Sequence, residues 1–260
     1  MDVVMSGSRY QTLRVRREDT ICRVQMHRPD AQNTINERML AEWHEVLDDC
    51  GAWATVVVVE GLADVFCMGA DLRGLREGDA PHDPQVLYGL WLRLAQGPFV
   101  SVAHVRGKAN AGGVGFAAAS DLVLCEEAST FSLSELLFGL VPACVLPFVV
   151  RRMGAARAQA MALLTQSLPA PQAVAWGLAD AVAADSERLV RTHLLRLRLL
   201  PRDGVARCKR YLARLDTTLQ ASQPAALSCN REVFADATNL ERIDRYLAHG
   251  EFPWQRPAAS

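Results

Sequence analysis

Three glycines follow a short apolar run near the middle of the chain. The run, residues 99–104, is followed by Gly112, Gly113 and Gly115, and then by small residues typical of a buried helix. A helix that begins soon after a strand leaves its first backbone N–H groups without acceptors, and the helix dipole favours negative charge there. The pattern predicts an anion-binding helix start, although the same glycines could serve only the close packing of a helix on a sheet.

A second glycine-containing loop follows the apolar run at residues 55–60. It occupies residues 61–72 and contains Gly69 and the acidic residue Asp71. Two such loops could each direct one backbone N–H at the same oxygen atom. That arrangement stabilises an oxyanion formed from a carbonyl, so the two loops together predict an oxyanion-stabilising site.

The length and composition favour a globular protein that acts on a small molecule or a protein. Half of the 260 residues are hydrophobic, which is enough to bury one large core, with or without a small appended unit. A formal net charge of −1 and a pI near 6.6 provide no overall basic field. Nucleic acid and anionic lipid are therefore not expected as partners.

The cysteines and the apolar runs indicate the cellular compartment in which we expect the protein. Seven scattered cysteines include no Cys-x-x-Cys pair, which argues against a disulfide framework and a zinc cage and predicts buried free thiols in a reducing cytoplasm. The start of the chain is too polar for a signal peptide. The longest apolar run, residues 136–150, contains Gly139 and two prolines, so it is too short and too broken to span a bilayer.

Hydrophobic periodicity places the two loops in a framework of strands and helices. Alternation at 10–16 and 21–27 predicts a hairpin, and helical spacing from residue 36 predicts a helix that residues 33–36 cap and Gly51 ends. Strands are also expected at 55–60, 99–104 and 121–125, a helix at 85–96, and a mobile polar stretch at 73–84. After Pro147 the pattern is almost wholly helical, at residues 155–165, 171–176, 186–199, 204–215, 221–236 and 239–249.

The change from strand-rich to helix-rich sequence is the one visible boundary. We place the core in residues 1–200 and a helical region in residues 201–260. Apolar stripes at 221–236 and 239–249 exceed what a closed core needs, and such surfaces usually bind a partner. Four arginines of the 186–199 region are expected on a solvated or subunit-facing surface: Arg188, Arg191, Arg196 and Arg198.

Five motifs, in this order, resemble the crotonase or enoyl-CoA hydratase/isomerase superfamily. They are His-Arg-Pro-Asp-Ala-Gln-Asn at 27–33, Phe-Cys-Met-Gly-Ala-Asp at 66–71, the glycine-rich stretch at 105–121, Phe-Ser-Leu-Ser-Glu-Leu-Leu-Phe-Gly at 131–139 and Ala-Val-Ala-Trp-Gly-Leu-Ala-Asp at 173–180. The resemblance covers about residues 10–250. It implies an α/β fold, a crotonase-like spiral of ββα units, with C-terminal helices that build a homotrimer or a dimer of trimers.

Within the superfamily, the chain is similar to the dehydratases of polyketide β-branching cassettes. The similarity lies in Asn-Thr-Ile-Asn at 33–36, in the segment 132–147 and in the ending Gly-Glu-Phe-Pro-Trp at 250–254. It implies removal of water from a 3-hydroxy-3-methylglutaryl group on an acyl carrier protein, which gives a 3-methylglutaconyl group. The phosphopantetheine arm would arrive with the substrate, and no metal or redox cofactor is implied. A CoA-linked hydratase, the following β-branching decarboxylase and a non-catalytic crotonase-fold binding subunit remain alternatives.

The match assigns roles to individual residues. The family's two oxyanion-hole residues fall on Ala70 and Gly112, which would act through backbone N–H groups. Glu135 matches the second of two catalytic glutamates, and its apolar neighbours favour a pKa raised by desolvation. The first glutamate falls on Gly115, so one carboxyl must serve as acid and base or share the work with another group. The implied substrate-binding residues are Met68, Gly69, Asp71, Leu72 and Gly113.

Each assignment has a structural competitor. Glu135 could be a helix-start carboxylate that interacts with the dipole, and we expect Asp71 to orient its own loop. Cys144 and His104 lie near the site in the sequence, but a buried cysteine and a strand histidine are more often packing residues. Three basic residues could recognise the distal carboxylate of the substrate, although solvated surface charge is expected for any one of them: Arg73, Arg76 and Lys108.

Overall fold

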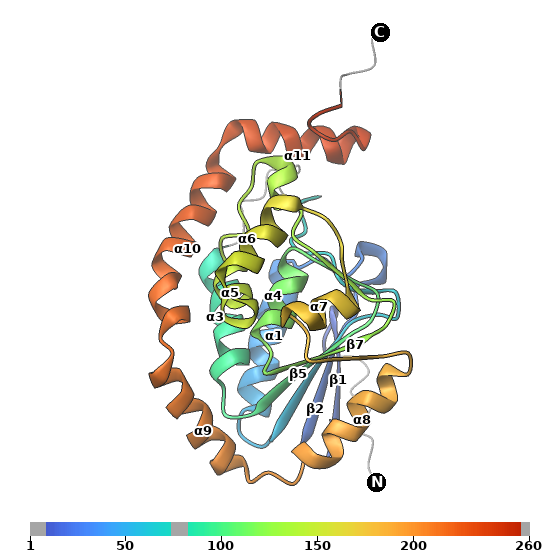
Figure 1. The fold of residues 1–260 in the computed structure, drawn as a ribbon, viewed down its shortest axis with the longest axis vertical. Coiled ribbons are helices and arrows are strands. Elements are labelled where there is room, and N and C mark those ends of the chain that lie inside the picture. Colours follow the sequence, from blue (N-terminus) through green and yellow to red (C-terminus); the bar gives the residue numbers. More distant parts are fainter. Residues whose placement is uncertain (1–8, 74–82, 256–260) are drawn as a thin grey trace.

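Two β-sheets form the centre of the protomer in the computed structural model, which describes residues 9–73 and 83–255 (Figure 1). The larger sheet has the strand order β1-β2-β3-β5-β7-β10, and the smaller has the order β4-β6-β8-β9. The strands are β1 Leu13–Glu18, β2 Ile21–Met26, β3 Val56–Glu60, β4 Val65–Cys67, β5 Val100–Val105, β6 Lys108–Asn110, β7 Leu122–Glu126, β8 Thr130–Ser132, β9 Leu168–Pro169 and β10 Ala181–Ala183. The helices are η1 Pro29–Ala31, α1 Glu37–Cys50, α3 Pro84–Gln96, α4 Gly112–Ala119, η2 Glu135–Phe138, α5 Leu146–Met153, α6 Ala155–Leu164, α7 Ala170–Trp176, α8 Ser186–Leu197, α9 Arg202–Leu215, α10 Thr218–Ala235 and α11 Ala237–His249.

Successive units of the chain place one strand in each sheet and then form a helix. β3, β4 and α3 make one unit, β5, β6 and α4 the next, and β7, β8 and η2 a third. The first strands of these units pair in parallel, for example Val59 with Ala103. The second strands also pair in parallel, with Ala109 opposite Phe131. This repetition confirms the expected spiral of ββα units.

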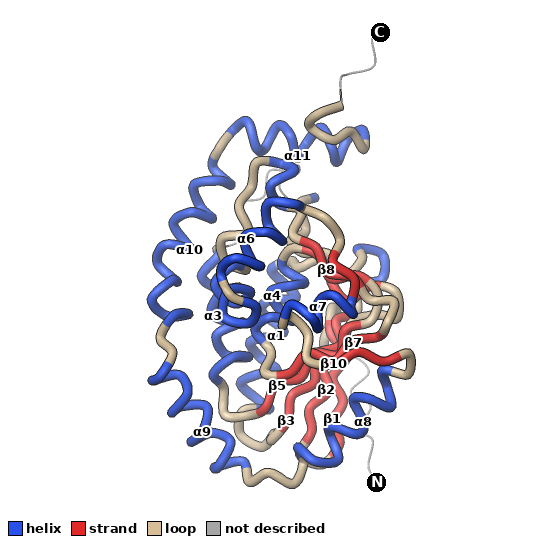
Figure 2. Tube along the Cα trace, in the orientation of Figure 1, coloured by secondary structure: helices blue, strands red, loops and turns tan. Residues whose placement is uncertain are grey.

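The larger sheet is a middle layer with helices on both faces (Figure 2). Val57 and Val59 of β3 belong to the main core, which also contains buried residues of α1, α3 and α4. Val56 and Val58 pack instead in a second cluster with residues of α8. A parallel strand that is covered on both faces has a continuous apolar sequence rather than an alternating one. This explains the run of four valines.

Several local predictions are confirmed. β1 and β2 form the antiparallel hairpin, with Val15 opposite Val24. The Asn36 side chain accepts a hydrogen bond from the N–H of Met39 at 2.9 Å and caps α1, and Gly51 follows its last residue. α3 begins at Pro84, where the Asp83 side chain caps it.

The smaller sheet was not predicted, and the expectation of an almost wholly helical chain after Pro147 needs correction. β4, β6 and β8 have three residues each, and β9 has two. An alternating pattern needs at least four residues to be recognised, so strands of this length leave no periodic signal. β9 and β10 interrupt the helical region, and α5 was also missed because its apolar run is broken at Pro147.

The C-terminal helices wrap around the core. α9 and α10 run along the outside of the layer that contains α3, and α11 crosses the end of the molecule beside η2 (Figure 1). The Nζ atom of Lys209 on α9 donates to the carbonyls of Leu94 and Phe99 at 3.1 and 2.9 Å and to Oδ2 of Asp121 at 2.5 Å. Leu219 of α10 is buried in the main core. The division at residue 200 and the trimerisation role of residues 201–260 remain predictions.

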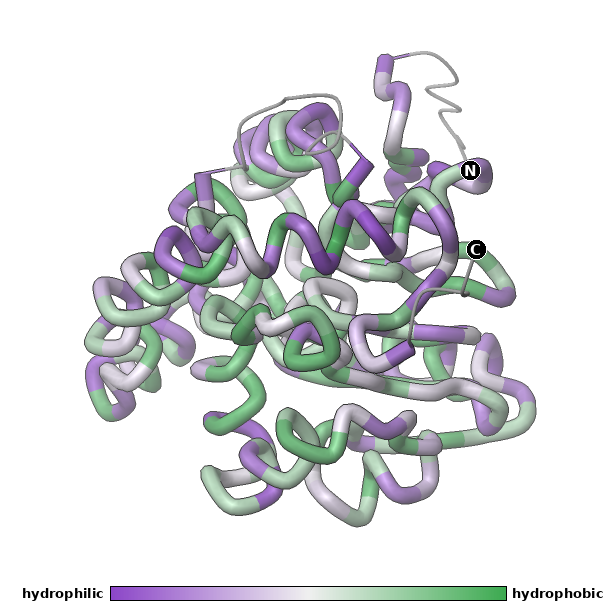
Figure 3. The backbone as a smooth tube through the Cα atoms, turned by 90° about the horizontal axis from the view of Figure 1, so that it is seen from above, coloured by the Kyte–Doolittle hydropathy of each residue, from purple (hydrophilic) through white to green (hydrophobic). Residues whose placement is uncertain are grey.

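Most of the large exposed apolar side chains lie outside the two stripes that the sequence suggested. Leu227 of α10 and Ile243 of α11 are buried within the protomer. Tyr246 of α11 is 36% exposed, and larger exposed fractions occur on α9, where Tyr211, Leu212 and Leu215 are 61%, 53% and 65% exposed. Hydrophobic and hydrophilic residues are interspersed along the outer helices, as expected for elements with one buried face (Figure 3). All four arginines of the 186–199 region are exposed in the protomer, as expected.

Two remaining predictions concern thiols and membranes. Five of the seven cysteines are buried free thiols, but Cys208 is exposed and Cys229 is half-buried, which corrects the expectation that all are buried. Within the described ranges, no helix has the length and apolar character needed to cross a bilayer. Most of the stretch predicted to be mobile, together with Arg76, lies outside the described residues.

Candidate active site

The loop after β4 presents the backbone N–H of Ala70. Ile35 forms an isolated parallel bridge with Ala70, in which the Ile35 N–H donates to the Gly69 carbonyl at 2.7 Å and the Asp71 N–H donates to the Ile35 carbonyl at 2.9 Å. Because this bridge uses the residues on either side of Ala70, the Ala70 N–H points away from Ile35. The described part of the chain supplies no acceptor for it.

The start of α4 presents a second N–H, that of Gly112. Ala111, which precedes the helix, has φ 50° and ψ −118°, a strained conformation for a residue with a side chain, and that side chain forms no cap. Gly112 N–H likewise has no hydrogen-bond acceptor among residues 9–73 and 83–255. A Cβ atom built on Gly69 would lie 3.2 Å from the Gly112 nitrogen. The structure therefore brings the two predicted donor loops into contact.

The remaining predicted substrate-binding residues differ in their surroundings. Met68 is half-buried, and Gly69 has φ +88°, a conformation that favours glycine. A Cβ atom on Gly113 would lie 2.1 Å from the Cys67 carbonyl oxygen, so this glycine lets α4 pack closely on β4. Leu72 packs in an apolar cluster under α11. Their contacts with substrate remain predictions.

Glu135 is the first residue of the short helix η2. Burial raises the pKa of its carboxyl to about 7, although the N–H groups of Glu135 and Ser134 oppose the rise. The residue as a whole is half-buried, but its Oε2 atom is out of contact with solvent and lacks a hydrogen-bond partner in the described structure. A helix dipole would have lowered the pKa, so desolvation outweighs the dipole of this four-residue turn. A carboxyl with such a pKa is suited to proton transfer near neutral pH.

Helix α11 holds the turn that carries this carboxyl. Gly139, which ends η2, has φ +81°, and a Cβ atom there would lie 2.1 Å from Oδ1 of Asn239 on α11. Phe138 of η2, Leu72 of the first donor loop and Ile243 of α11 pack in one apolar cluster. One C-terminal helix of the same protomer therefore contacts the carboxyl-bearing turn and shares an apolar cluster with the first donor loop.

Asp71 has the structural role that we expected. Its Oδ2 atom lies 2.8 Å from Nη2 of Arg28, and its Oδ1 atom accepts the N–H of Arg73 at 3.3 Å. Burial would raise the pKa of Asp71, but these hydrogen bonds and the charge of Arg28 hold it below its ordinary value. Arg28 also donates to the Thr34 carbonyl. Arg28 precedes η1 and Thr34 follows it, so the ion pair fixes the first donor loop against the segment around η1. Sequence reasoning had assigned no role to Arg28.

His104 lies on the wrong face of the sheet for the site. Ala103 and Val105 face the main core with α4, whereas Val102 faces α8, so the alternation of β5 directs His104 toward α8 as well. Its Nε2 atom is 3.0 Å from Oγ of Ser186, and its Nδ1 atom is 3.4 Å from Oε1 of Glu60. A catalytic role for His104 at the predicted site is therefore excluded by position.

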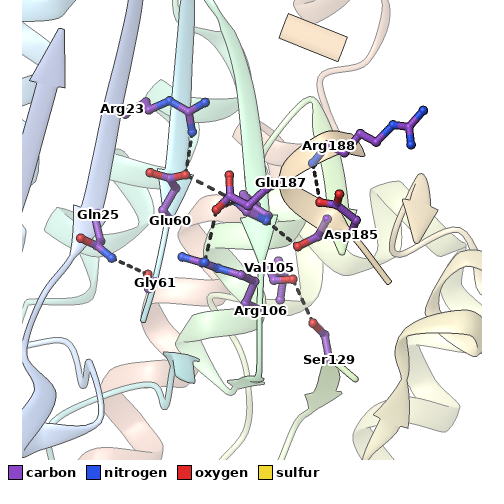
Figure 4. Close-up of polar contacts among 12 residues, drawn as sticks. Arg23, Gln25, Glu60, Gly61, Val105, Arg106, Ser129, Asp185, Glu187 and Arg188 are labelled. Carbon is purple, nitrogen blue, oxygen red and sulfur yellow. Dashed lines mark hydrogen bonds and ion pairs between the residues drawn. The ribbon is translucent and has the colours of Figure 1, made fainter. Parts of the chain in front are cut away.

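Arginines pair with the two carboxylates that lie beside His104, Glu60 and Glu187. Figure 4 shows both pairs, Arg23 with Glu60 and Arg106 with Glu187. Glu60 pairs with Arg23 at 2.8 Å, and Glu187 pairs with Arg106 at 3.2 Å. Desolvation would raise the pKa of Glu60, but His104 and the arginines hold it below its ordinary value. Ion pairing accounts for both carboxylates, so we regard this cluster as a structural link between the sheet and α8.

Cys144 and the surface cations are less suited than Glu135 to a catalytic role. Cys144 is buried, and burial raises the pKa of its thiol to about 12, so very little thiolate is present at neutral pH. Arg73 and Lys108 are exposed, as expected for solvated surface charge. Among the residues that the sequence singled out, Glu135 is the one that combines burial with a pKa near neutrality.

A family model for enoyl-CoA hydratase/isomerase matches residues 16–257. The chain belongs to the enoyl-CoA hydratase/isomerase family. The bacillaene synthase dehydratase PksH of Bacillus subtilis is 44% identical over 254 residues, which cover 95% of this chain and 97% of PksH. The enoyl-CoA hydratase ACTT6 of Alternaria alternata is 31% identical, over 80% of this chain and 70% of its own.

Solved structures of family members share the fold. A crystal structure from Bacillus subtilis, described as a polyketide biosynthesis enoyl-CoA hydratase, has a TM-score of 0.92 and 44% identity, covering 94% of this chain and all of that one. An enoyl-CoA hydratase from Mycobacterium avium subsp. paratuberculosis has a TM-score of 0.83 and 27% identity, covering 95% of this chain. The predicted fold class and the predicted class of enzyme, a hydro-lyase of this family, are confirmed.

The raised pKa of Glu135 predicts that Glu135→Gln stabilises the protein at pH 8 but not at pH 5. A folded-state pKa of about 7, against 4.5 ordinarily, means that the folded state holds this proton more tightly. The stability that this bound proton gives to the folded state is fully present below pH 4.5 and is lost as the pH rises through 7. The rise corresponds to on the order of 1–3 kcal/mol once partial solvent access is considered.

Denaturant unfolding at the two pH values measures this effect. Glu232→Gln makes the same chemical change at an exposed position of α10 and serves as the matched control. An equal gain for Glu135→Gln at pH 5 and pH 8 would show that the carboxyl is not protonated preferentially in the folded state.

Proposed function

We propose that this protein removes water from a 3-hydroxy-3-methylglutaryl thioester carried on an acyl carrier protein, giving the 3-methylglutaconyl thioester during polyketide β-branching. The observation that carries the proposal is the buried carboxyl of Glu135, with a pKa of about 7 and a partnerless Oε2. The N–H groups of Ala70 and Gly112, on two loops that contact each other, supply the complementary function. The 44% identity to the dehydratase PksH supports this choice of reaction.

In the proposed reaction, the Glu135 carboxylate takes a proton from the α carbon of the thioester. The electron pair of that C–H bond forms an enolate, whose oxygen accepts hydrogen bonds from the N–H groups of Ala70 and Gly112. The enolate then collapses as the carbon–carbon double bond forms and the bond to the β-hydroxyl breaks. The hydroxyl takes the proton from Glu135 and leaves as water, which returns Glu135 to its carboxylate form.

The rate enhancements expected from these groups are large enough for enzymatic catalysis. A preorganised N–H donor typically contributes about 10²–10³ in rate, because it interacts more strongly with the enolate than with the neutral carbonyl. A positioned acid or base contributes about 10²–10⁴. Proton transfer and charge stabilisation by these groups call for no metal or redox cofactor. The phosphopantetheine arm belongs to the carrier-bound substrate, and we expect the protein to meet its carrier in the cytoplasm.

Mass spectrometry of the carrier-bound acyl group tests this function. Purified protein is given first the 3-hydroxy-3-methylglutaryl carrier and then its dehydrated product. We expect loss of water from the first and no loss of carbon dioxide from the second. Loss of carbon dioxide from the second would identify the decarboxylase instead, and no change in either would identify a non-catalytic subunit. Equal turnover of the corresponding CoA thioester would favour a CoA-linked hydratase.

We also propose that three protomers associate, as a homotrimer or a dimer of trimers. The exposed apolar side chains of Tyr211, Leu212 and Leu215 on α9 support this assembly, because such a surface is usually covered by a partner. Light scattering at micromolar concentration should give three or six times the protomer mass. Leu215→Glu places a charge on this surface and should shift the mass toward the monomer. A monomeric parent protein would contradict the proposed assembly.

A further inference from the structure

Helix α4 carries a second glycine close to its first donor. Gly115 follows Gly112 by three residues, so the two lie on the same side of the helix. A Cβ atom built on Gly115 would lie 2.3 Å from Cζ2 and 2.4 Å from Cη2 of Trp91 on α3. Real Cβ atoms essentially never approach another heavy atom closer than 3.0 Å. The indole ring therefore occupies the space that any side chain at position 115 would need.

Packing holds this ring in place. Trp91 is completely buried. Phe116 meets it edge to face at a ring-centroid distance of 6.0 Å and an interplanar angle of 81°, and Phe148 does so at 5.7 Å and 77°. A rigid ring held on two sides cannot yield by the distance that a Cβ atom at position 115 would require. Trp91 and a side chain at position 115 are thus mutually exclusive.

The same ring also reaches the first donor of α4. A Cβ atom on Gly112 would lie 3.8 Å from Cζ2 of Trp91 and 2.8 Å from Cδ1 of Ile35. Ile35 in turn forms the bridge that orients the other donor, Ala70. Trp91 therefore packs along one face of α4, from the donor at its first residue to the position one turn later.

We infer that Trp91 closes the α4 side of the site to a second carboxyl group, so Glu135 alone carries the proton from the α carbon to the leaving hydroxyl. This inference rests on the proposed function and deepens it. One proton is taken from the α carbon, and the same group returns one proton to the hydroxyl, so no second acid is required. Asp71, the other acidic residue predicted at the site, is engaged by Arg28.

A double variant, Trp91→Ala/Gly115→Glu, tests the inference by opening the space and adding a carboxyl. Two carboxylates that share a site repel each other, so the pKa of Glu135 should rise clearly above its parental value. The matched control, Trp91→Ala, opens the same space without a charge, admits water and should lower that pKa. Infrared difference spectra, taken against Glu135→Gln in each background, follow the protonated carboxyl of Glu135 across the titration.

Opposite shifts in the two variants support the inference, and equal titrations would overturn it, because position 115 would then not face Glu135. The titration requires no turnover, so its outcome is independent of whether the carrier-bound substrate loses water. If the double variant does not fold, a double-mutant cycle on the free energy of unfolding still tests the steric exclusion. Gly115→Ala should reduce the midpoint of denaturant unfolding more when Trp91 is present than in a Trp91→Leu background. Additive losses would contradict the steric exclusion.

Discussion

Replacing Glu135 by glutamine is expected to lower kcat for water loss by about 10²–10⁴-fold, with little change in the affinity for the loaded carrier protein. Glutamine keeps the shape of the side chain and its capacity for hydrogen bonds, but it can neither take the α proton nor return one to the leaving hydroxyl. Single-turnover kinetics with the loaded carrier separates the chemical step from binding. The expected loss is confined to that step.

Glu232→Gln on the exposed surface of α10 is the matched control and should retain the parental rate. Should Glu135→Gln keep more than about a tenth of the parental rate, a difference of only about 1.4 kcal/mol in the barrier, the essential carboxyl must lie elsewhere. Asp71→Asn and Cys144→Ser would then be the next variants to measure. Equal losses of carrier binding and turnover would instead indicate a collapsed turn at η2.

Removing or displacing either backbone donor is expected to lower kcat by about 10²–10³-fold. Ala70→Pro removes the N–H itself. The bridge to Ile35 uses the Gly69 carbonyl and the Asp71 N–H, so those two hydrogen bonds do not depend on the lost group. Gly112→Val acts differently, because its side chain would meet Ile35 Cδ1 and displace the first turn of α4. Steady-state kinetics of folded variants measures both effects.

Ala70→Gly keeps the N–H group and is the matched control for Ala70→Pro. It should remain within a few-fold of the parental rate, apart from the cost of a more flexible loop. Parental turnover by folded Ala70→Pro or folded Gly112→Val would show that the proposed pair of donors is wrong.

The two donor loops, each of which follows a strand, could be predicted because the sequence patterns that mark them are local. The run of four valines in β3 and the glycines at the start of α4 could be recognised within a few residues, and both donor loops were found in this way. The smaller sheet could not be recognised, because strands of two or three residues carry no period and are fixed by their neighbours. Tertiary pairing, not intrinsic preference, makes β4, β6 and β8 strands.

The environment of each site residue was harder to predict than its identity. The apolar neighbours of Glu135 suggested a raised pKa, but only the packing of η2 shows that Oε2 lacks both solvent and a partner. The alternation of β5 could have placed His104 away from the site once the face that packs on α4 was known. The contact between Trp91 and Gly115 could not be predicted from the sequence, because it joins two helices that come together only on folding.

The pH dependence of kcat/KM for water loss tests the central claim most directly, that one carboxyl with a pKa of about 7 begins the reaction as a base. The parent protein should gain about tenfold per pH unit below 7 and level off above it, because only the ionised form of Glu135 can take the α proton. Loss of activity as the pH rises above 7, or a rate that does not vary between pH 5 and pH 9, would contradict this assignment.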